Sequence, residues 1–212
     1  DHALLADALV SLYQATFDLR WLREARALMD ATLERFWDER EGVFYDTAVD
    51  AERLVIRPRD LWDNATPSGS SSAIHALLRL AELLGEERYR AVSARALEGT
   101  AQLAGRVPAG FGWLLSALDF HLSTPVEIAV VGTPGDADTE ALLRVAGRTY
   151  LPNAVTALRR PEEDGAGEEL VPLLRGRTAR GGRATAYVCE RLACQQPVNE
   201  PAELAEQLSA TE

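Results

Sequence analysis

The residues best suited to chemistry lie together at 57–72, where the chain reads Arg-Pro-Arg-Asp-Leu-Trp-Asp-Asn-Ala-Thr-Pro-Ser-Gly-Ser-Ser-Ser. This stretch combines two carboxylates, an amide, several hydroxyls and a large aromatic ring. Carboxylates, an amide and free backbone N–H groups next to a helix start together make a good surface for hydroxyl-rich ligands. We therefore expect a substrate-binding site for such a ligand, formed by Asp60, Trp62, Asp63, Asn64 and Ser68.

The same residues also suit an ordinary helix entry. Thr66 before Pro67 is typical of an N-cap followed by proline at the first helical position, where the missing N–H costs nothing. Asp63 and Asn64 then lie just outside the positive end of a helix predicted over 67–84. A carboxylate at this place stabilises the helix whether or not a ligand binds, so both interpretations stay open.

Charge and composition limit the classes of function. The 212 residues carry 22 basic and 33 acidic side chains, for a formal net charge of −11. Nucleic-acid phosphates require clustered cations, so we expect no nucleic-acid partner. No run reaches the roughly eighteen apolar residues that span a bilayer, and the chain starts without a basic leader region. We expect a cytoplasmic globular protein with no membrane partner, no metal and no cofactor.

Helical periodicity dominates the first 124 residues. Apolar residues recur on one face of a first helix, and a second run follows after a short connection, which predicts an antiparallel hairpin. The first face comprises Leu5, Leu9, Leu12 and Thr16. A second hairpin is predicted over 67–104, with Gly85 between its helices, and a constant offset of about 68 residues relates the two hairpins. An unpaired helix over 109–122 ends the series.

From Pro125 onward the pattern changes to strands and helices in alternation. Strands are predicted over 126–131, 154–158 and 184–189, with helices over 139–148 and 201–208. A strand–helix–strand order favours parallel pairing. We therefore expect an α+β chain with helical hairpins over 1–124 and a small α/β subdomain, with a mostly parallel sheet, over 125–212.

Cys189 and Cys194 are five residues apart, which leaves three roles open. A redox pair prefers two intervening residues, and a zinc site needs further ligands that the three histidines do not supply. Residues five apart on one continuous strand face opposite sides, so a disulfide requires a bend at 191–193. We favour two structural thiols, with a disulfide and a redox or metal role as alternatives.

Three segments resemble one known family. They read Arg-Pro-Arg-Asp-Leu-Trp-Asp-Asn-Ala-Thr-Pro-Ser-Gly at 57–69, Leu-Leu-Ser-Ala-Leu-Asp-Phe at 114–120 and Ala-Tyr-Val-Cys-Glu-Arg-Leu-Ala-Cys-Gln at 186–195. In this order they resemble the C-terminal part of thioredoxin-domain-containing proteins similar to spermatogenesis-associated protein 20. The family typically has Asn where this chain has Ser70, which weakens the expectation of a ligand contact at that position.

The resemblance implies a specific architecture. Members of the family resemble a fusion of an N-terminal thioredoxin-like domain to an (α/α)6 toroid of the six-hairpin glycosidase and N-acylglucosamine 2-epimerase type. This chain would hold the last hairpins of that toroid, with the thioredoxin-like domain and the remaining toroid segments of the parent chain as its partners. Epimerases of this type use paired histidines inside the toroid, so His2, near the start of an inner helix, joins the candidate substrate-binding residues.

Whether the chain is an enzyme, and which residues would be catalytic, stay open. The resemblance implies a carbohydrate-active protein, epimerase-like or glycosidase-like, or one that only binds carbohydrate. The alternatives are a structural module that supports the thioredoxin-like domain, and a redox role for Cys189 and Cys194.

Overall fold

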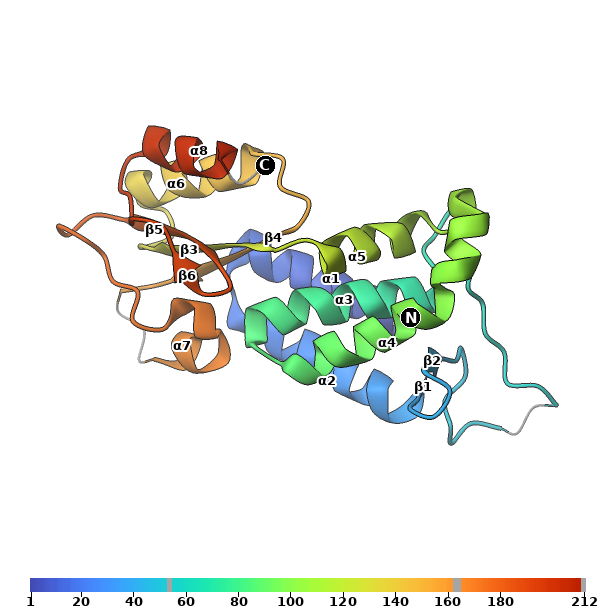
Figure 1. Ribbon diagram of the computed structural model, residues 1–212. Helices are drawn as coiled ribbons and strands as arrows, with labels where there is room; N and C mark the ends of the chain where they lie inside the picture. Colours follow the sequence, from blue (N-terminus) through green and yellow to red (C-terminus); the bar gives the residue numbers. More distant parts are fainter. Residues whose placement is uncertain (53–54, 162–164, 211–212) are drawn as a thin grey trace. The chain divides into compact units, whose positions relative to one another are not determined.

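The chain contains both helices and strands, arranged in two compact units. The computed structural model describes residues 1–52, 55–161 and 165–210. One unit comprises Asp1–Ala81 and Glu86–Leu122, and the other comprises Glu82–Gly85 and Ser123–Glu212 (Figure 1). The expected α+β class is confirmed. Within the described residues, none of the helices has the length and apolar character that crossing a membrane requires.

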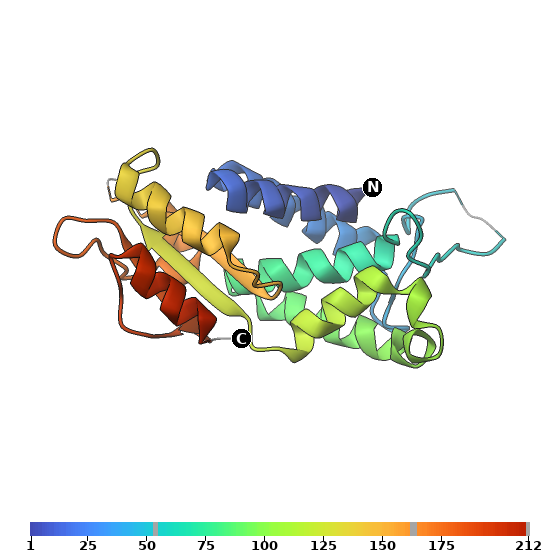
Figure 2. The same ribbon diagram turned by 90° about the horizontal axis from the view of Figure 1, so that it is seen from above.

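The first unit consists of helical hairpins. Two antiparallel pairs and a further helix follow one another along the chain (Figures 1 and 2). The helices are α1 (His2–Thr16), α2 (Leu19–Arg35), α3 (Gly69–Leu84), α4 (Glu87–Arg106) and α5 (Gly112–Leu122), with a 3-10 turn, η1 (Pro108–Gly110), before α5. A two-stranded hairpin of β1 (Trp37–Asp38) and β2 (Val43–Phe44) follows α2.

Both tight connections depend on a left-handed residue. Phe17 ends α1 at φ 55°, and its N–H bonds to the carbonyl of Tyr13. Asp18 then caps α2, because its carboxylate accepts the N–H of Arg20 at 2.9 Å. Gly85 takes φ +66° in the second connection, where glycine avoids the steric cost of a Cβ.

The buried face of α1 differs from the expected one. Ala3, Ala6, Val10 and Tyr13 are buried, whereas Leu5 is 53% exposed and Leu12 is exposed as well. The prediction was wrong because α1 is apolar around most of its circumference, so periodicity does not single out one stripe. The small side chains on the buried face allow close packing against α2.

The start of α3 also differs from the expectation. The helix begins at Gly69, two residues after the predicted Pro67, and Ser68 rather than Thr66 acts as the cap. The Ser68 hydroxyl accepts the N–H of Ser71 at 3.1 Å, and its carbonyl accepts the N–H of Ser72 at 3.0 Å. The Thr-Pro signal was overridden because Ser68 is itself fixed by Asp63, as described below.

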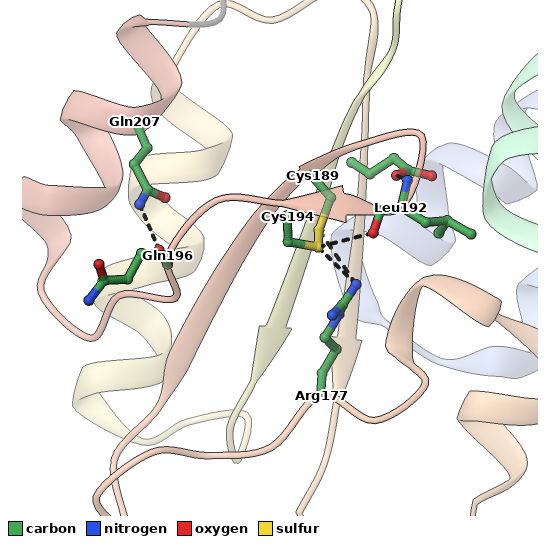
Figure 3. Close-up of a disulfide and its surroundings, with 7 residues drawn as sticks. Arg177, Cys189, Leu192, Cys194, Gln196 and Gln207 are labelled. Atoms are coloured by element: carbon green, nitrogen blue, oxygen red, sulfur yellow. Dashed lines mark hydrogen bonds between the residues drawn. A yellow bond between two sulfur atoms is a disulfide. The ribbon is translucent and has the colours of Figure 1, made fainter.

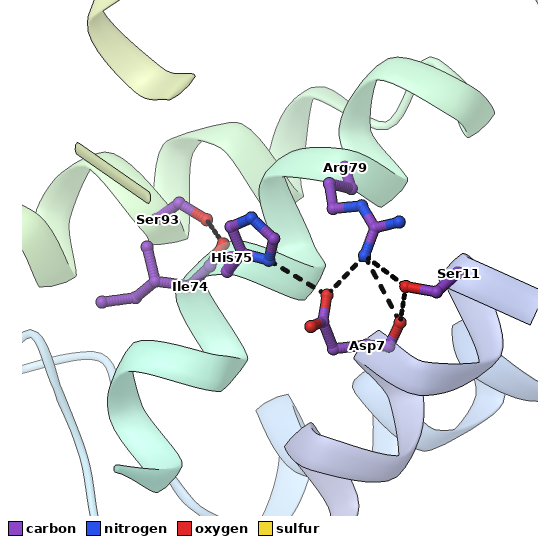
Figure 4. A network of polar contacts seen from close by, with 6 residues as sticks. All are labelled: Asp7, Ser11, Ile74, His75, Arg79 and Ser93. Atoms are coloured by element: carbon purple, nitrogen blue, oxygen red, sulfur yellow. Dashed lines mark hydrogen bonds and ion pairs between the residues drawn. The ribbon is translucent and has the colours of Figure 1, made fainter. Parts of the chain in front are cut away.

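The repeat places equivalent positions in contact. Asp7 on α1 and His75 on α3 are 68 residues apart, and the Asp7 carboxylate lies 3.0 Å from Nδ1 of His75 (Figure 4). Arg79 donates to the same carboxylate oxygen at 2.7 Å and to the hydroxyl of Ser11 at 3.1 Å. All three ionisable side chains are at most 15% exposed. Asp7 therefore supplies the counter-charge of Arg79 and a hydrogen-bond partner of His75 between adjacent hairpins.

The second unit contains a four-stranded sheet in the order β4-β3-β5-β6. Its strands are β3 (Val126–Val131), β4 (Ala154–Arg159), β5 (Thr185–Glu190) and β6 (Ala193–Cys194). Helices α6 (Ala137–Arg148) and α8 (Pro201–Ser209) cover one face, and α7 (Ala166–Leu170) with the 3-10 turn η2 (Pro172–Leu174) lies on the other (Figure 1). The central strand β3 is buried at all six positions.

The expectation of a mostly parallel sheet was wrong. The β3–α6–β4 segment gives the predicted parallel pair, but β5 runs antiparallel to β3, and β6 antiparallel to β5. Thr185, which begins β5, pairs with Val131, which ends β3. The connection after β4 thus returns the chain at the edge where β3 ends. Among the described residues of this connection, no long crossover helix carries the chain to the opposite edge.

The favoured assignment of Cys189 and Cys194 as structural thiols was also wrong. The two cysteines form a disulfide between directly paired residues of β5 and β6. The bend that such a bond requires is present, because Arg191 and Leu192 both adopt positive φ, 50° and 64°, and form a two-residue hairpin turn. Turns of this kind usually contain Asn and Gly.

The Asp7 cluster predicts a pH-dependent contribution to stability. Burial by itself raises the pKa of Asp7, but the hydrogen bond from His75 and the charges of Arg79 and His75 outweigh burial, so the pKa lies below the ordinary 3.8. A carboxyl with a lowered folded-state pKa stabilises the fold above its unfolded-state pKa, and this stabilisation is lost as the pH falls through the folded-state value.

We expect Asp7→Asn to lower the free energy of unfolding by about 3 kcal/mol at pH 7, because it leaves Arg79 buried without its counter-charge. The difference from the wild type should shrink as the pH falls below about 4. Urea unfolding at pH 7 and pH 3 measures both values. Glu24→Gln on the exposed side of α2 is the matched control and should change stability by less than about 0.5 kcal/mol. An equal loss at both pH values would mean that packing, and not charge, is responsible.

Candidate functional site

A cavity of about 380 Å³ lies in the helical unit, where α1 and α3 begin and α2 ends. Its size falls within the range of small-molecule sites. The structure brings five of the six expected substrate-binding residues to its wall. They are His2, Asp60, Trp62, Asn64 and Ser68.

Another part of the wall comes from segments that the sequence did not connect with the site. Phe36 follows α2, Phe44 belongs to β2, and Tyr45 and Asp46 follow it directly. The ring of His2 lies 5.3 Å from that of Phe36. The cavity therefore pairs an aromatic side with the polar segment at 60–68.

Trp62 presents a partly exposed indole ring to this cavity. The ring is packed at 5.0 Å from that of Phe111, and the residue remains 42% exposed. Gly110 lies directly against the ring, since a Cβ at Gly110 would come within 2.5 Å of it. The backbone N–H of Trp62 donates to the Asp60 carboxylate at 3.0 Å. Trp62 is thus held through its backbone and through one side of its indole ring.

Asp60 is tied to a second carboxylate in the wall. The N–H of Asp60 donates to Oδ2 of Asp46 at 2.6 Å, so the segment at 57–62 is fixed to the residue that follows β2. The side chain of Asn64 makes one long contact, 3.5 Å from Nδ2 to the carbonyl of Trp62. Asp60 and Asn64 are both exposed, and their remaining hydrogen-bonding capacity faces water.

Asp63 has a different environment from the other five candidates. It borders a separate cavity near the start of α5, together with Asn64, Pro67 and Trp113. Oδ1 accepts the N–H of Ser68 at 2.8 Å, and Oδ2 accepts those of Trp113 and Leu114 at 2.8 and 2.9 Å. These are free N–H groups of helix starts, which a carboxylate satisfies well. Asp63 therefore holds the starts of α3 and α5 together.

Ser68 is also engaged in structure. It is buried, and its hydroxyl bonds to that of Ser71 at 2.8 Å while it caps α3. Ser68 thus borders the cavity with a hydroxyl that is already hydrogen-bonded within the protein.

The electrostatic character of the cavity is acidic. Asp1, Asp46 and Asp60 lie on the wall, and no arginine is found among the described residues that line it. Arg59, next to Asp60 in the chain, lies outside the wall. Burial lowers the pKa of Arg59 from its ordinary value, while the charges of Tyr45 and Asp46 oppose this effect. An anionic ligand finds no counter-charge in this wall, whereas a neutral or cationic ligand does not need one.

Metal binding has no obvious location in the part of the chain that the structure describes. There, no three or more His, Cys, Asp or Glu side chains gather as a group that could hold an ion.

Comparisons with known proteins find relatives whose sequences match nearly the whole chain. The chain is 31% identical over 205 residues to spermatogenesis-associated protein 20 of Rattus norvegicus and 30% identical over 205 residues to the protein of that name in Homo sapiens. Both matches cover 96% of this chain and 26% of the relative. Uncharacterized protein B0495.5 of Caenorhabditis elegans is 26% identical over 208 residues, which is 97% of this chain and 28% of that protein.

The chain thus spans about a quarter of the length of these relatives. No protein-family model matches it.

The contacts of Asp63 predict a structural effect of its substitution. Asp63→Asn should lower the free energy of unfolding by about 2 to 3 kcal/mol, because charge-assisted bonds to three N–H groups weaken and an amide group then faces a donor. Denaturant unfolding of the two proteins measures the loss. Asp60→Asn is the matched control and should cost less than about 1 kcal/mol, since Asp60 is exposed and accepts a single local N–H. Equal losses in the two variants would contradict the role assigned to Asp63.

Proposed function

We propose that the cavity between α1, the end of α2 and the segment at 57–69 binds a small neutral or amino sugar. The observation that carries this proposal is that His2, Asp60, Trp62 and Asn64 border one cavity of ligand size. A half-exposed indole beside exposed carboxylate and amide groups suits a ring that has an apolar face and a rim of hydroxyls.

The ligand class follows from the charges of the wall. Three carboxylates without an arginine disfavour phosphorylated sugars and uronic acids and favour neutral or amino sugars. We propose binding rather than hydrolysis. A glycosidase needs two carboxylates facing each other across the sugar, and Asp63, which was expected beside Asp60, is engaged by three backbone N–H groups.

We further propose that the chain is the C-terminal part of a longer protein of the spermatogenesis-associated protein 20 family, with a thioredoxin-like domain and an (α/α)6 toroid, in the cytoplasm. The matches to one quarter of each relative support a longer parent. The exposed leucines of α1 support further hairpins, because a neighbouring hairpin in a toroid would cover that face.

The proposal predicts selective sugar binding by the intact protein that contains this chain. Calorimetric titration with a panel of neutral, amino and phosphorylated monosaccharides should give binding for at least one neutral or amino sugar and none for its phosphate. Trp62→Ala and Asp60→Ala should each weaken that binding at least about tenfold, or roughly 1.4 kcal/mol.

Glu98→Gln on the exposed side of α4, outside the cavity, is the control and should leave the affinity unchanged. Asp63 is unsuitable for this test, because its substitution affects the fold. Tight binding of a sugar that survives both cavity substitutions would remove the site from this cavity, and absence of binding by any sugar would refute the proposed function.

The second candidate is a structural module that supports the thioredoxin-like domain. The observation that favours it is that Asp63 and Ser68, two of the six expected residues, bind backbone groups of the fold itself. This function predicts no sugar binding. It also predicts that removal of residues 125–212 lowers the melting temperature of the intact protein, which differential scanning calorimetry measures.

A further inference from the structure

The disulfide between Cys189 and Cys194 has an arginine beside it (Figure 3). Nη2 of Arg177 lies 2.8 Å from Sγ of Cys194 and 3.8 Å from Sγ of Cys189. We propose that this disulfide is a thiol–disulfide exchange site that takes two electrons from a dithiol, with Arg177 as the residue that stabilises the thiolates formed. The site is distinct from the proposed sugar cavity, since all its residues belong to the second unit.

The guanidinium of Arg177 lacks a negative partner in the oxidised form. Within the described residues Arg177 makes no ion pair with a carboxylate, and its buried Nε has no hydrogen-bond partner. Its other close neighbour is the ring of Tyr187, 5.3 Å from the guanidinium carbon. A partly buried cation facing two neutral sulfur atoms is poorly compensated. A thiolate at either sulfur supplies the missing charge.

The position of Arg177 is fixed by its surroundings. The hydroxyl of Tyr187 donates to the carbonyl of Thr178 at 2.7 Å and accepts the N–H of Thr178 at 3.2 Å. Arg159 donates to the carbonyl of Arg177 at 2.9 Å. These bonds anchor the backbone at 177–178 to β4 and β5, so the guanidinium stays within reach of the two sulfurs when the disulfide opens.

The two sulfurs differ in access. Cys189, near the end of β5, is 1% exposed, whereas Cys194 on the edge strand is partly exposed. A thiolate from solution therefore attacks Sγ of Cys194, and Cys189 is the leaving group. Arg177 contacts both sulfurs, so it stabilises either one as the thiolate.

The hairpin turn favours opening. Arg191 and Leu192 hold two consecutive left-handed backbone conformations without glycine, which is strained for residues that carry a Cβ. The N–H of Leu192 donates to Oε2 of Glu127, a carboxylate 3% exposed on β3, at 2.7 Å. Reduction breaks the covalent link between Cys189 and Cys194, which lie on either side of this turn.

Glu127 also distinguishes the two cysteines after reduction. It pairs directly with Cys189 across β3 and β5, so both side chains emerge on the same face of the sheet. Cys189 therefore lies beside a buried carboxyl group, whereas Cys194 lies closer to Arg177, at 2.8 Å against 3.8 Å. The lasting thiolate is therefore Cys194.

The exchange is balanced as two displacements. A thiolate of the dithiol attacks Cys194, a mixed disulfide forms, and Cys189 leaves as a thiolate and takes a proton. The second sulfur of the dithiol then attacks its own mixed-disulfide sulfur and releases Cys194. The protein S–S bond is broken, one S–S bond forms in the reagent, and two electrons pass to the protein. Of the two protons that the dithiol loses, one stays on Cys189 and one goes to solvent.

The test uses the intact folded protein with dithiothreitol and glutathione redox buffers as probes. Alkylation followed by mass spectrometry of the peptide that contains both cysteines measures the fraction reduced at each buffer ratio, and also the alkylation rate of Cys194 at pH 7. We expect Arg177→Gln to shift the equilibrium toward the disulfide about tenfold and to slow alkylation of Cys194 by a similar factor, as for a thiolate fraction that falls tenfold.

Two further variants separate charge from structure. Arg177→Lys keeps the positive charge and should stay within about threefold of the wild type in both measurements. Arg180→Gln removes an exposed cation from the same loop without a sulfur contact and should leave both unchanged. Circular dichroism verifies that each variant is folded.

Two results would overturn the proposal. One is a disulfide that dithiothreitol does not reduce in the folded wild-type protein, which would identify a purely structural bond. The other is an Arg177→Gln variant with the same equilibrium and the same alkylation rate as the wild type, or one matched by Arg180→Gln.

Discussion

The helical unit depends on one carboxylate. Asp63 accepts hydrogen bonds from the first residues of two helices, and its own N–H donates to the carbonyl of Gly110 at 2.9 Å. Helix starts present N–H groups that have no partner within the helix, and here a single side chain satisfies three of them from outside. A stretch without regular secondary structure is thereby fixed to α3 and α5. The hydrogen bonds of Asp63 therefore also fix the position of the cavity wall that begins at Asp60.

Asp60, Trp62 and Asn64 remain exposed because Asp63 makes the structural hydrogen bonds of this segment. The segment that carries Asp60, Trp62 and Asn64 needs few further bonds to the fold, so their side chains keep free hydrogen-bonding and stacking capacity. Gly110 has a related role, since the absence of a Cβ lets Trp62 lie against η1. Polar residues that look equivalent in the sequence thus divide into those that build the site and those that line it. The division follows from which of them faces a helix start.

Much of the fold could be predicted from periodicity, and the failures have physical reasons. The two hairpins, their offset and the β3–α6–β4 segment follow from local patterns, whereas the bend between the cysteines had no turn signal in the sequence. The buried face of α1 did not, because leucines surround Ala6 and Val10 on a helix that is apolar on most sides. The direction of β5 depends on the path of the chain after β4, which no local signal records. Phe36 and Asp46 lie outside the stretch that contains Asp60, so no local pattern in the sequence could predict that all three border one cavity.

The clusters around Asp7 and around Arg177 differ in whether the central charge has an oppositely charged partner. Asp7 lies between His75 and Arg79, so its negative charge is matched and the cluster joins two hairpins without a need for any ligand. The backbone of Arg177 is held by Arg159, but its guanidinium faces two neutral sulfur atoms. A satisfied buried ion cluster resists change, because each partner loses its counter-charge when another leaves. A partly buried cation without a counter-charge favours a reaction that creates an anion beside it, and reduction of the adjacent disulfide is such a reaction.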